Sequence, residues 1–439
     1  MSALATPFLT VRSLARRLDG RDTDYDALLG MALGRHFVLL GEATHGTREF
    51  YRMRAQITRR LIVEQGFDGV AVEGDWPDAW RVDRYVQGLG ENDATSSLDD
   101  FERFPQWMWR NREVLEFVSW LHAHNASRAP PARVGFYGLD LYSLYRSADA
   151  VIRYLQAFDP EQADIARRRY AALDHVRDPQ LYGYQAASGL RPAAREGAIA
   201  QLLHLRRDAQ LQREHGGDPA GIDAQFVAER NAALVVNAEN YYRAMFEGRT
   251  NTWSLRDAHM RDTVHALAQY RIRRGGSGKL VVWAHNSHLG DARATESHLR
   301  AEWNLGQLIR EEAGNDALLV GFTTYTGHVS AASEWDGDVE HKWVRPALRD
   351  SYEHLLYSAG LDRFFLRLDE PAAEPLQEPM LERAIGVLYR PETERASHYF
   401  VASLAHQFDA IFHLDETAAL EPLDAPRHWH RPEAADAAA

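Results

Sequence analysis

The sequence predicts an α/β protein with a mostly parallel central sheet flanked by helices, and with a helical insertion that forms part of an active-site cleft. Short apolar runs rich in β-branched residues recur along the chain, separated by longer amphipathic patterns. The runs are apolar almost throughout rather than alternating, which is typical of strands that are covered on both faces. A long central stretch carries helical patterns and no convincing strand. Together these patterns favour crossover units around one sheet.

The strands are expected at eight places along the chain. The strongest candidates are HFVLL (36–40), GVAVE (69–73), RVGFYG (133–138), KLVVWA (279–284) and ALLVGFTT (317–324). The weaker candidates are RFFLRL (363–368), AIGVLY (384–389) and DAIFHL (409–414). After the first run, an apolar stripe through Phe50 and Ile57 predicts a helix that Thr47 caps and Gly66 ends.

The chain is expected to fall into four parts. Residues 1–150 and 276–425 carry the two parts of the α/β core. Residues 151–275 form a helical insertion or cap, in which GGDPAG (216–221) is the turn between two helices. Residues 426–439 form a tail.

Composition excludes several classes of protein. The formal net charge of −13 argues against a nucleic-acid partner, because such proteins need a basic face. It would suit a cationic substrate if the cleft itself is acidic. The absence of cysteine excludes disulfides, thiolate metal sites and a cysteine nucleophile. No stretch approaches a membrane span and no signal-peptide pattern opens the chain, so a cytoplasmic protein is expected.

Polar clusters follow the strands directly, in the stretches GEATHG, EGDWPDAW, GLDLYS, HNSHLG and YTGHVS. In parallel α/β sheets ligands bind at the carboxyl ends of the strands, where the connecting loops converge. We therefore expect the polar side chains of these clusters to gather at one edge of the sheet. They are Glu42, His45, Glu73, Asp75, Asp140, His285, His288 and His328.

His45 suits the role of general base, because an imidazole changes charge near physiological pH. Glu42 or Glu73 could fix its tautomer. The sequence contains no Gly-x-Ser-x-Gly elbow, so the nucleophile is expected to be water rather than serine. Arg54 and the backbone N–H groups at the start of the first helix are candidates to stabilise an oxyanion.

Four motifs carry a resemblance to a known family. GEATHGTREFYRMR, AVEGDW, WAHNSHLGD and RAIGVLYRPETERASHYF, in this order, resemble the erythromycin esterase family from about residue 30 to about residue 420. The resemblance implies an α/β hydrolase unrelated to the serine α/β-hydrolases. Members of that family that inactivate antibiotics open the macrolactone of erythromycin-type macrolides, and they are regarded as needing no metal.

The resemblance also implies roles for individual residues. His45 matches the histidine that activates water and Glu42 its companion glutamate, and the other matching positions are Arg54, Glu73, His285 and His288. Substrate contacts are expected from Asp75, Trp76, Asp140 and His328. GEATHGT and YRPETERASHY look like the broad environmental branch of the family, so the substrate is a small-molecule ester or lactone, with a macrolide as one candidate. No cofactor, metal, membrane or nucleic-acid partner is expected.

Two other functions remain open from the sequence. The same glutamates and histidines could hold a zinc or manganese ion in a metal-dependent hydrolase, although no HExxH pair is present. A non-catalytic protein could instead hold a small molecule or a haem-like cofactor in the cleft. Trp107 and Trp109, in the aromatic stretch FPQWMWRNREV (104–114), are interpreted as core residues rather than cleft lining.

Overall fold

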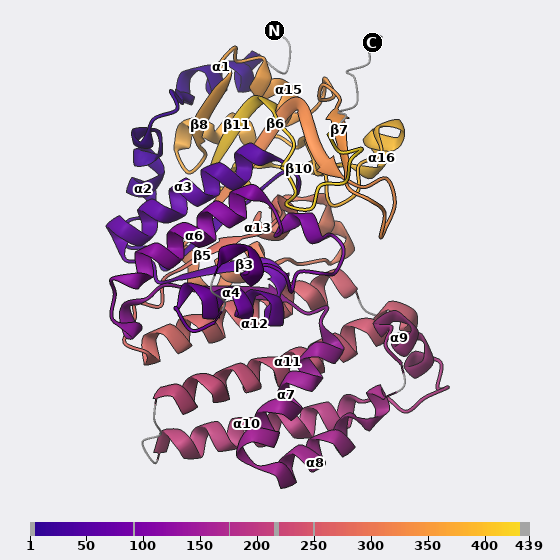
Figure 1. Cartoon of the computed structure of the whole chain (residues 1–439). Coiled ribbons are helices and arrows are strands. Elements are labelled where there is room, and N and C mark those ends of the chain that lie inside the picture. The colour runs from indigo at the N-terminus through magenta and orange to yellow at the C-terminus, as the bar shows by residue number, and fades with distance from the viewer. Residues whose placement is uncertain (1–4, 91–92, 175, 215–218, 249–250, 431–439) are drawn as a thin grey trace. The chain divides into compact units, whose positions relative to one another are not determined.

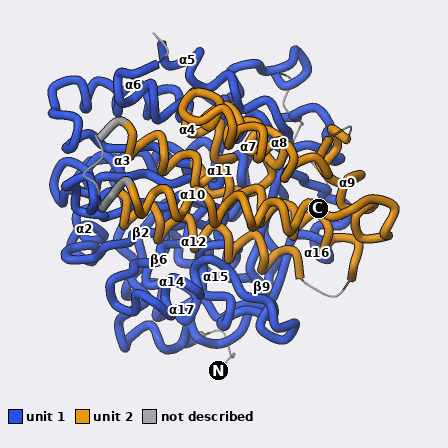
Figure 2. Tube along the Cα trace, turned by 90° about the horizontal axis from the view of Figure 1, so that it is seen from below, with its two compact units in different colours: residues 1–73, 81–137, 271–439 blue, residues 74–80, 138–270 orange. Residues whose placement is uncertain are grey.

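The computed structural model describes residues 5–90, 93–174, 176–214, 219–248 and 251–430 (Figure 1). The chain divides into two compact units (Figure 2). The first unit comprises residues 1–73, 81–137 and 271–439. The second comprises residues 74–80 and 138–270.

A nine-stranded sheet forms the centre of the first unit, in the order β1-β8-β11-β6-β2-β5-β3-β4, with β7 paired to β6. Strands β2, β3, β5, β6 and β11 pair in parallel, whereas β1, β7 and β8 join their partners antiparallel. The strands are β1 (Arg16–Arg17), β2 (Phe37–Leu40), β3 (Gly69–Asp75), β4 (Gly135–Asp140), β5 (Leu280–Trp283), β6 (Ala317–Ala331), β7 (Glu340–Val344), β8 (Arg363–Arg367) and β11 (Ala410–Thr417). A separate antiparallel pair joins β9 (Met380–Arg383) to β10 (Tyr399–Ala402).

The predicted fold class, an α/β protein with a mostly parallel sheet, is confirmed. One predicted strand is wrong, because residues 384–389 form only isolated bridges, at Ile385 to Thr44 and at Leu388 to Ala332. The regular pairing lies just before them, in β9. Strands β1, β7, β9 and β10 were not predicted, because each is short and carries charged or exposed residues that give no apolar run.

Helices α2, α3 and α6 lie side by side in the first unit (Figure 1). The ring of Phe50 in α3 lies 5.6 Å from that of Phe322 in β6, and the indole N–H of Trp283 donates to the Thr58 hydroxyl at 2.9 Å. Helix α3 ends at Gly66 with φ of 69°, as predicted, but the Thr47 side chain does not cap it and bonds to the Thr44 hydroxyl instead. The helices of this unit are α1 (Ala5–Leu14), α2 (Asp26–Ala32), α3 (Arg48–Gln65), α5 (Ala94–Ser97), α6 (Arg112–Ala126), α13 (Asn286–Leu289), α14 (Leu305–Ala313), α15 (Tyr352–Tyr357), α16 (Glu394–Ser397) and α17 (Leu404–Gln407).

The second unit is helical, with α11 in contact with α7, α9 and α10, and with α8 packed on α7 and α10. The rings of Phe226 in α11 and Tyr270 in α12 stack with their centroids 4.0 Å apart. The helices are α4 (Trp76–Val86) and α12 (Thr252–Arg273), which each run on into the first unit, and α7 (Leu144–Phe158), α8 (Pro160–Tyr170), α9 (Pro179–Ala187), α10 (Arg195–Glu214) and α11 (Pro219–Glu247).

Two predicted segments fall partly outside the described residues. Of the turn at 216–221, residues 216–218 lie outside them, and so do residues 431–439 of the tail. In the described part of the tail, Trp429 is buried, and its indole N–H donates to the Ser330 hydroxyl at 2.7 Å. In the part of the chain that the structure describes, no helix has the length and apolar character needed to cross a membrane.

Candidate active site

The six predicted catalytic residues lie together in the first unit. Strands β2, β5 and β3 are neighbours in the sheet and run parallel, so the residues at their carboxyl ends meet at one edge. Glu42 and His45 follow β2, Glu73 lies near the end of β3, and His285 and His288 follow β5. Arg54 reaches the group from α3. All six side chains are buried.

Glu42 links His45 to Arg54. Its Oε1 atom lies 2.9 Å from His45 Nδ1, and its Oε2 atom accepts a hydrogen bond from Arg54 Nη2 at 2.6 Å. Because a carboxylate only accepts hydrogen bonds, the proton of the neutral imidazole stands on Nδ1. The lone pair of the ring is therefore on Nε2, which points away from Glu42.

The environment of Arg54 explains why a charged side chain is stable in the core. Arg54 is 0% exposed, and its guanidinium lies over the rings of Tyr51 at 4.4 Å and Trp283 at 5.2 Å. Burial and the Glu42 carboxylate raise the pKa of Tyr51 well above its usual value, so its phenol stays neutral. Arg54 thus balances the charge of Glu42.

Glu73 faces both histidine-bearing loops. Its Oε2 atom accepts the backbone N–H of His285 at 2.8 Å, and its Oε1 atom lies 3.3 Å from His288 Nε2. The same Oε1 atom is 4.0 Å from His45 Nε2. Two hydrogen-bond acceptors therefore face each other across a gap that is too wide for a direct bond.

His285 is held as a neutral imidazole. Burial and, next, the neighbouring His45 lower its pKa to about 3, against the opposing charge of Glu73. Its Nδ1 atom accepts the backbone N–H of Ser287 at 3.2 Å, so the ring proton is expected on Nε2. The ring centroids of His285 and His45 are 4.8 Å apart. His285 can therefore donate a hydrogen bond from Nε2 but cannot act as a base near neutral pH.

The turn that carries His45 is fixed by backbone contacts on both sides. His45 N–H donates to the Ile385 carbonyl at 3.2 Å, and the Gly46 carbonyl accepts N–H groups from Ser330 at 3.0 Å and Leu420 at 2.8 Å. A Cβ atom on Gly46 would lie 1.8 Å from the Ser330 carbonyl oxygen. Only glycine permits this approach of two backbones.

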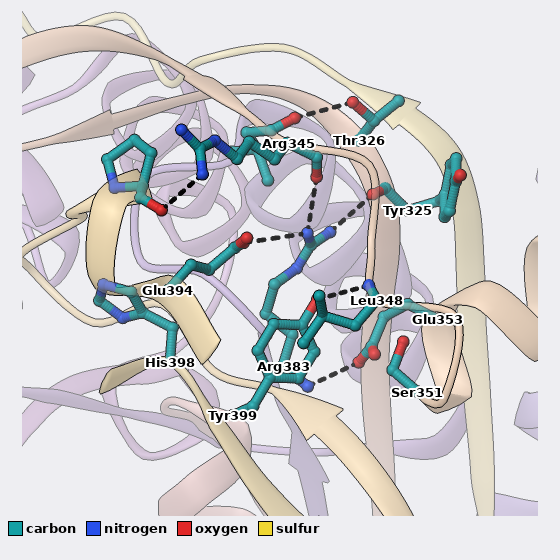
Figure 3. A network of polar contacts seen from close by, with 12 residues as sticks. Tyr325, Thr326, Arg345, Leu348, Ser351, Glu353, Arg383, Glu394, His398 and Tyr399 are labelled. Atoms are coloured by element: carbon teal, nitrogen blue, oxygen red, sulfur yellow. Dashed lines mark hydrogen bonds and ion pairs between the residues drawn. The ribbon is translucent and has the colours of Figure 1, made fainter. Parts of the chain in front are cut away.

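Arg383 anchors the segment whose Ile385 carbonyl accepts the His45 N–H, and Figure 3 shows the polar contacts of this arginine. Its Nη2 atom donates to the carbonyls of Thr324 and Tyr325 in β6 at 2.6 and 2.8 Å, and its Nη1 atom donates to the Arg345 carbonyl at 2.8 Å. Glu394 is 3.3 Å from the same Nη1 atom. Sequence reasoning missed Arg383, although it opens the RAIGVLY motif, because nothing local distinguishes a buried arginine from an exposed one.

The four residues predicted to bind substrate are divided between the two units, and each contacts other protein groups. Asp75, Trp76 and Asp140 lie in the second unit. Asp75 accepts the backbone N–H of Tyr142 at 3.1 Å, Asp140 accepts two hydrogen bonds from Arg256 at 2.9 and 2.6 Å, and Trp76 stacks on Trp80 with centroids 6.2 Å apart. His328 lies in β6 of the first unit, where its ring meets His341 of β7 edge-on at 5.0 Å.

The arrangement of the glutamates and histidines does not resemble a metal site. Within the described residues, no group of three or more histidines or carboxylates is arranged so that it could hold a metal ion. The glutamates and histidines at the strand ends instead pair with one another and with Arg54.

Comparisons with known proteins identify the family and the fold of this chain. The family model described as erythromycin esterase matches residues 62–417. The chain is 20% identical to "Erythromycin esterase type II" of Escherichia coli, over 92% of this chain and 96% of that protein. Among solved structures, a succinoglycan biosynthesis protein aligns with a TM-score of 0.75 and 22% identity over 96% of this chain and 99% of its own. A mutant of the erythromycin esterase EreC in its open conformation aligns with a TM-score of 0.65 and 18% identity over 90% and 94%.

Proposed function

This chain belongs to the erythromycin esterase family, and on that premise we propose that it hydrolyses a small-molecule ester or lactone with a water molecule activated by His45. Membership of the family supports a hydrolase, and the choice of substrate and of general base is our proposal.

The observation that carries the proposal is the orientation of His45. With Nδ1 bonded to Glu42, the basic Nε2 atom faces Glu73 Oε1 across 4.0 Å. A water molecule that donates one hydrogen to each of these acceptors fits such a separation. It would be oriented and polarised before any substrate enters.

The reaction would then proceed by general-base catalysis. His45 Nε2 takes a proton from the water as its oxygen bonds to the carbonyl carbon, and the imidazolium is stabilised by the Glu42 carboxylate. The Nε2–H group of His285 suits the oxyanion of the tetrahedral intermediate. When the carbon–oxygen bond to the leaving group breaks, the His45 imidazolium returns its proton to the departing alkoxide. The products are a carboxylic acid and an alcohol, joined in one molecule if the substrate is a lactone.

Arg54 has a positioning role in this scheme rather than a direct one. Its Nη2 atom is occupied by Glu42 and the side chain is fully buried, so it holds the Glu42 side chain in place. The sequence made Arg54 a candidate to stabilise the oxyanion. We assign this role to His285 instead, because its Nε2–H group is available as a donor.

The macrolactone of erythromycin-type macrolides is one candidate substrate, since relatives of this chain bear the name erythromycin esterase. The direct test incubates the purified protein with macrolides, simple lactones and aryl esters, and follows hydrolysis by mass spectrometry. His45→Asn is the matched control, and we expect it to lower kcat/KM by about 10²- to 10⁴-fold on any substrate found. Full activity in this variant would refute the role of His45. Elemental analysis distinguishes the metal-dependent alternative, which requires a stoichiometric metal whose removal abolishes turnover.

A further inference from the structure

The segment that follows β11 binds the turn that carries the proposed base, and we call residues 418–429 the strap. The Arg48 N–H, at the start of α3, donates to the Ala418 carbonyl at 2.9 Å. Thr47 and Ala419 form an isolated antiparallel bridge. The strap is therefore joined to the turn by backbone contacts, which do not depend on the identity of the side chains.

Gly46 is the point at which the strap and β6 meet the turn. Its carbonyl accepts the N–H groups of Ser330 in β6 at 3.0 Å and of Leu420 in the strap at 2.8 Å. The Ser330 hydroxyl in turn donates to the Leu420 carbonyl at 2.6 Å. All three residues are buried. A displacement of Ser330 or Leu420 would therefore move the carbonyl group that is next to His45.

Trp429, near the far end of the strap, fixes the hydroxyl of Ser330. Its indole N–H donates to Ser330 Oγ at 2.7 Å. An indole N–H can only donate, and the single proton of the hydroxyl is directed to the Leu420 carbonyl. The three groups therefore form a chain of hydrogen bonds with one direction, in which each bond polarises the next.

Trp429 is itself held against β7. Its ring stacks on that of His341, with centroids 4.9 Å apart and planes inclined by 20°. The preceding His428 places its Nε2 atom 3.0 Å from the Val339 carbonyl. Trp429 is buried, and an indole removes a large apolar surface from water when it is buried. This one side chain therefore anchors the far end of the strap to the sheet.

His45 is sensitive to a small movement of its turn. Its Nδ1 atom lies 2.9 Å from Glu42 Oε1, and its Nε2 atom faces Glu73 Oε1 across 4.0 Å. The turn is held on one side where the His45 N–H meets the Ile385 carbonyl, and on the other by the carbonyl of Gly46. If the second support loosens, the ring can rotate away from Glu42, and misplacement of a catalytic group by about 1 Å can cost about 10²-fold in rate.

We propose that Trp429 is a positioning residue of the His45 site, and that it acts through Ser330 and Gly46 to keep the imidazole against Glu42. The catalytic part of this proposal rests on the function proposed above, whereas the effect on the His45 ring does not. The strap is thus a working part of the site, although it lies far from the motif residues in the sequence.

The first test is kinetic. Trp429→Phe keeps an aromatic ring beside His341 but lacks the indole N–H, and Ser330→Ala removes the acceptor. Each should lower kcat by about 10- to 10²-fold and leave KM within about twofold, because alignment is lost and substrate binding is not. The double variant should fall no more than about twofold below Ser330→Ala, since both substitutions break the same chain. Tyr25→Phe is the matched control: it removes a hydrogen bond to Gln56 elsewhere in the first unit, 2.6 Å long, and should leave kcat within about twofold.

The second test needs no substrate. The ¹⁵N chemical shifts of the imidazole nitrogens report which nitrogen carries the proton, and the His45 signals are those that His45→Asn removes. In the wild type the neutral ring should be protonated on Nδ1, because Glu42 accepts from that nitrogen. In Trp429→Phe and in Ser330→Ala the two tautomers should approach equal populations. Tyr25→Phe should keep the wild-type shifts.

The outcomes distinguish this proposal from the proposed function. Near-ultraviolet circular dichroism first confirms that each variant is folded, and Ser330→Ala carries the same expectation if Trp429→Phe is not. A purely structural role for Trp429 would lower stability and leave the tautomer unchanged. Wild-type tautomer populations in the folded variants, additive losses in the double variant, or an equal loss in Tyr25→Phe would overturn the proposal. The proposed function fails separately, if the wild type hydrolyses no ester or lactone, and the change of tautomer alone then decides the role of Trp429.

Discussion

The Nδ1 atom of His45 lies 2.9 Å from Oε1 of Glu42, and this contact determines which nitrogen of the imidazole can accept a proton. The Glu42 carboxylate also accepts a hydrogen bond from the fully buried Arg54 guanidinium. The orientation of the proposed base therefore depends on a buried pair of charged side chains. The roles proposed for these groups lead to four predictions.

Glu42→Gln should lower kcat/KM by about 10- to 10³-fold, because an amide can accept from Nδ1–H but cannot stabilise the imidazolium. It also leaves Arg54 without a counter-charge, which should lower the free energy of unfolding by about 3–5 kcal/mol. Glu64→Gln, in the exposed Arg60–Glu64 pair of the same helix, is the control and should cost less than about 1 kcal/mol. Urea unfolding and steady-state kinetics measure the two effects, and equal costs in the two variants would contradict the buried-pair interpretation.

His285→Asn should lower kcat/KM without moving the acid limb of the pH profile. Burial and the neighbouring His45 lower the pKa of His285 to about 3, so this ring is neutral on both sides of the limb. The loss should be about 10²-fold, the effect of removing one oxyanion donor. The measurement is kcat/KM between pH 5 and pH 9 in both proteins. A shift of the acid limb in the variant would show that His285 itself titrates there.

Gly46→Ala should destabilise the protein by about 3 kcal/mol or more, because the added methyl group meets backbone atoms of Ser330 rather than a movable side chain. Activity should fall with it, since the neighbouring His45 must shift. Gly30→Ala, at an open position in α2, is the control and should be neutral or stabilising by about 0.5–1 kcal/mol. Thermal unfolding of the two variants tests this, and similar midpoints would be evidence against the close approach.

Glu382→Gln should flatten the dependence of stability on pH. Glu382 is fully buried, and burial followed by the neighbouring Glu353 raises its pKa well above the usual 4.5. The folded state then binds a proton that the unfolded state releases above about pH 4.5, so wild-type stability falls as pH rises towards the raised pKa. The variant cannot ionise at this position and should lose the part of the decline that Glu382 causes, while buried Glu353, whose pKa burial also raises, keeps its own contribution. Urea unfolding at pH 5 and pH 8.5 measures it, with the exposed Glu378→Gln as a control that should retain the wild-type slope.

Much of the fold could be predicted because its signals are local. The run at Phe37–Leu40 is apolar at every position, and the structure makes it a central strand with both faces covered. The polar clusters after β2 and β5 could be assigned to one sheet edge from the parallel arrangement alone, without knowing the strand order. The bonds of Glu42 to both His45 and Arg54 required the coordinates, since either glutamate could have oriented the imidazole.

What could not be predicted depends on contacts between distant segments. Residues 384–389 have the apolar content of a strand, but Arg383 fixes the chain just before them and Ile385 bonds to Ala43 instead of to a continuous strand. Trp107 was interpreted as a core residue, and its burial agrees, yet it also lines a pocket together with the exposed Glu102 and Asp336. Sequence patterns indicate how buried a residue is more readily than which surface it borders.

The contrast between exposed side chains and the clamped His45 turn has a consequence for how this protein can change over generations. Glu102, Asp336 and Asp338 project from the surface and hold no other part of the molecule in place, whereas the His45 turn is clamped by Gly46 and by its backbone partners. Substitutions should therefore be tolerated at the three exposed positions, whereas substitutions in the turn should be selected against because they move several backbone segments at once.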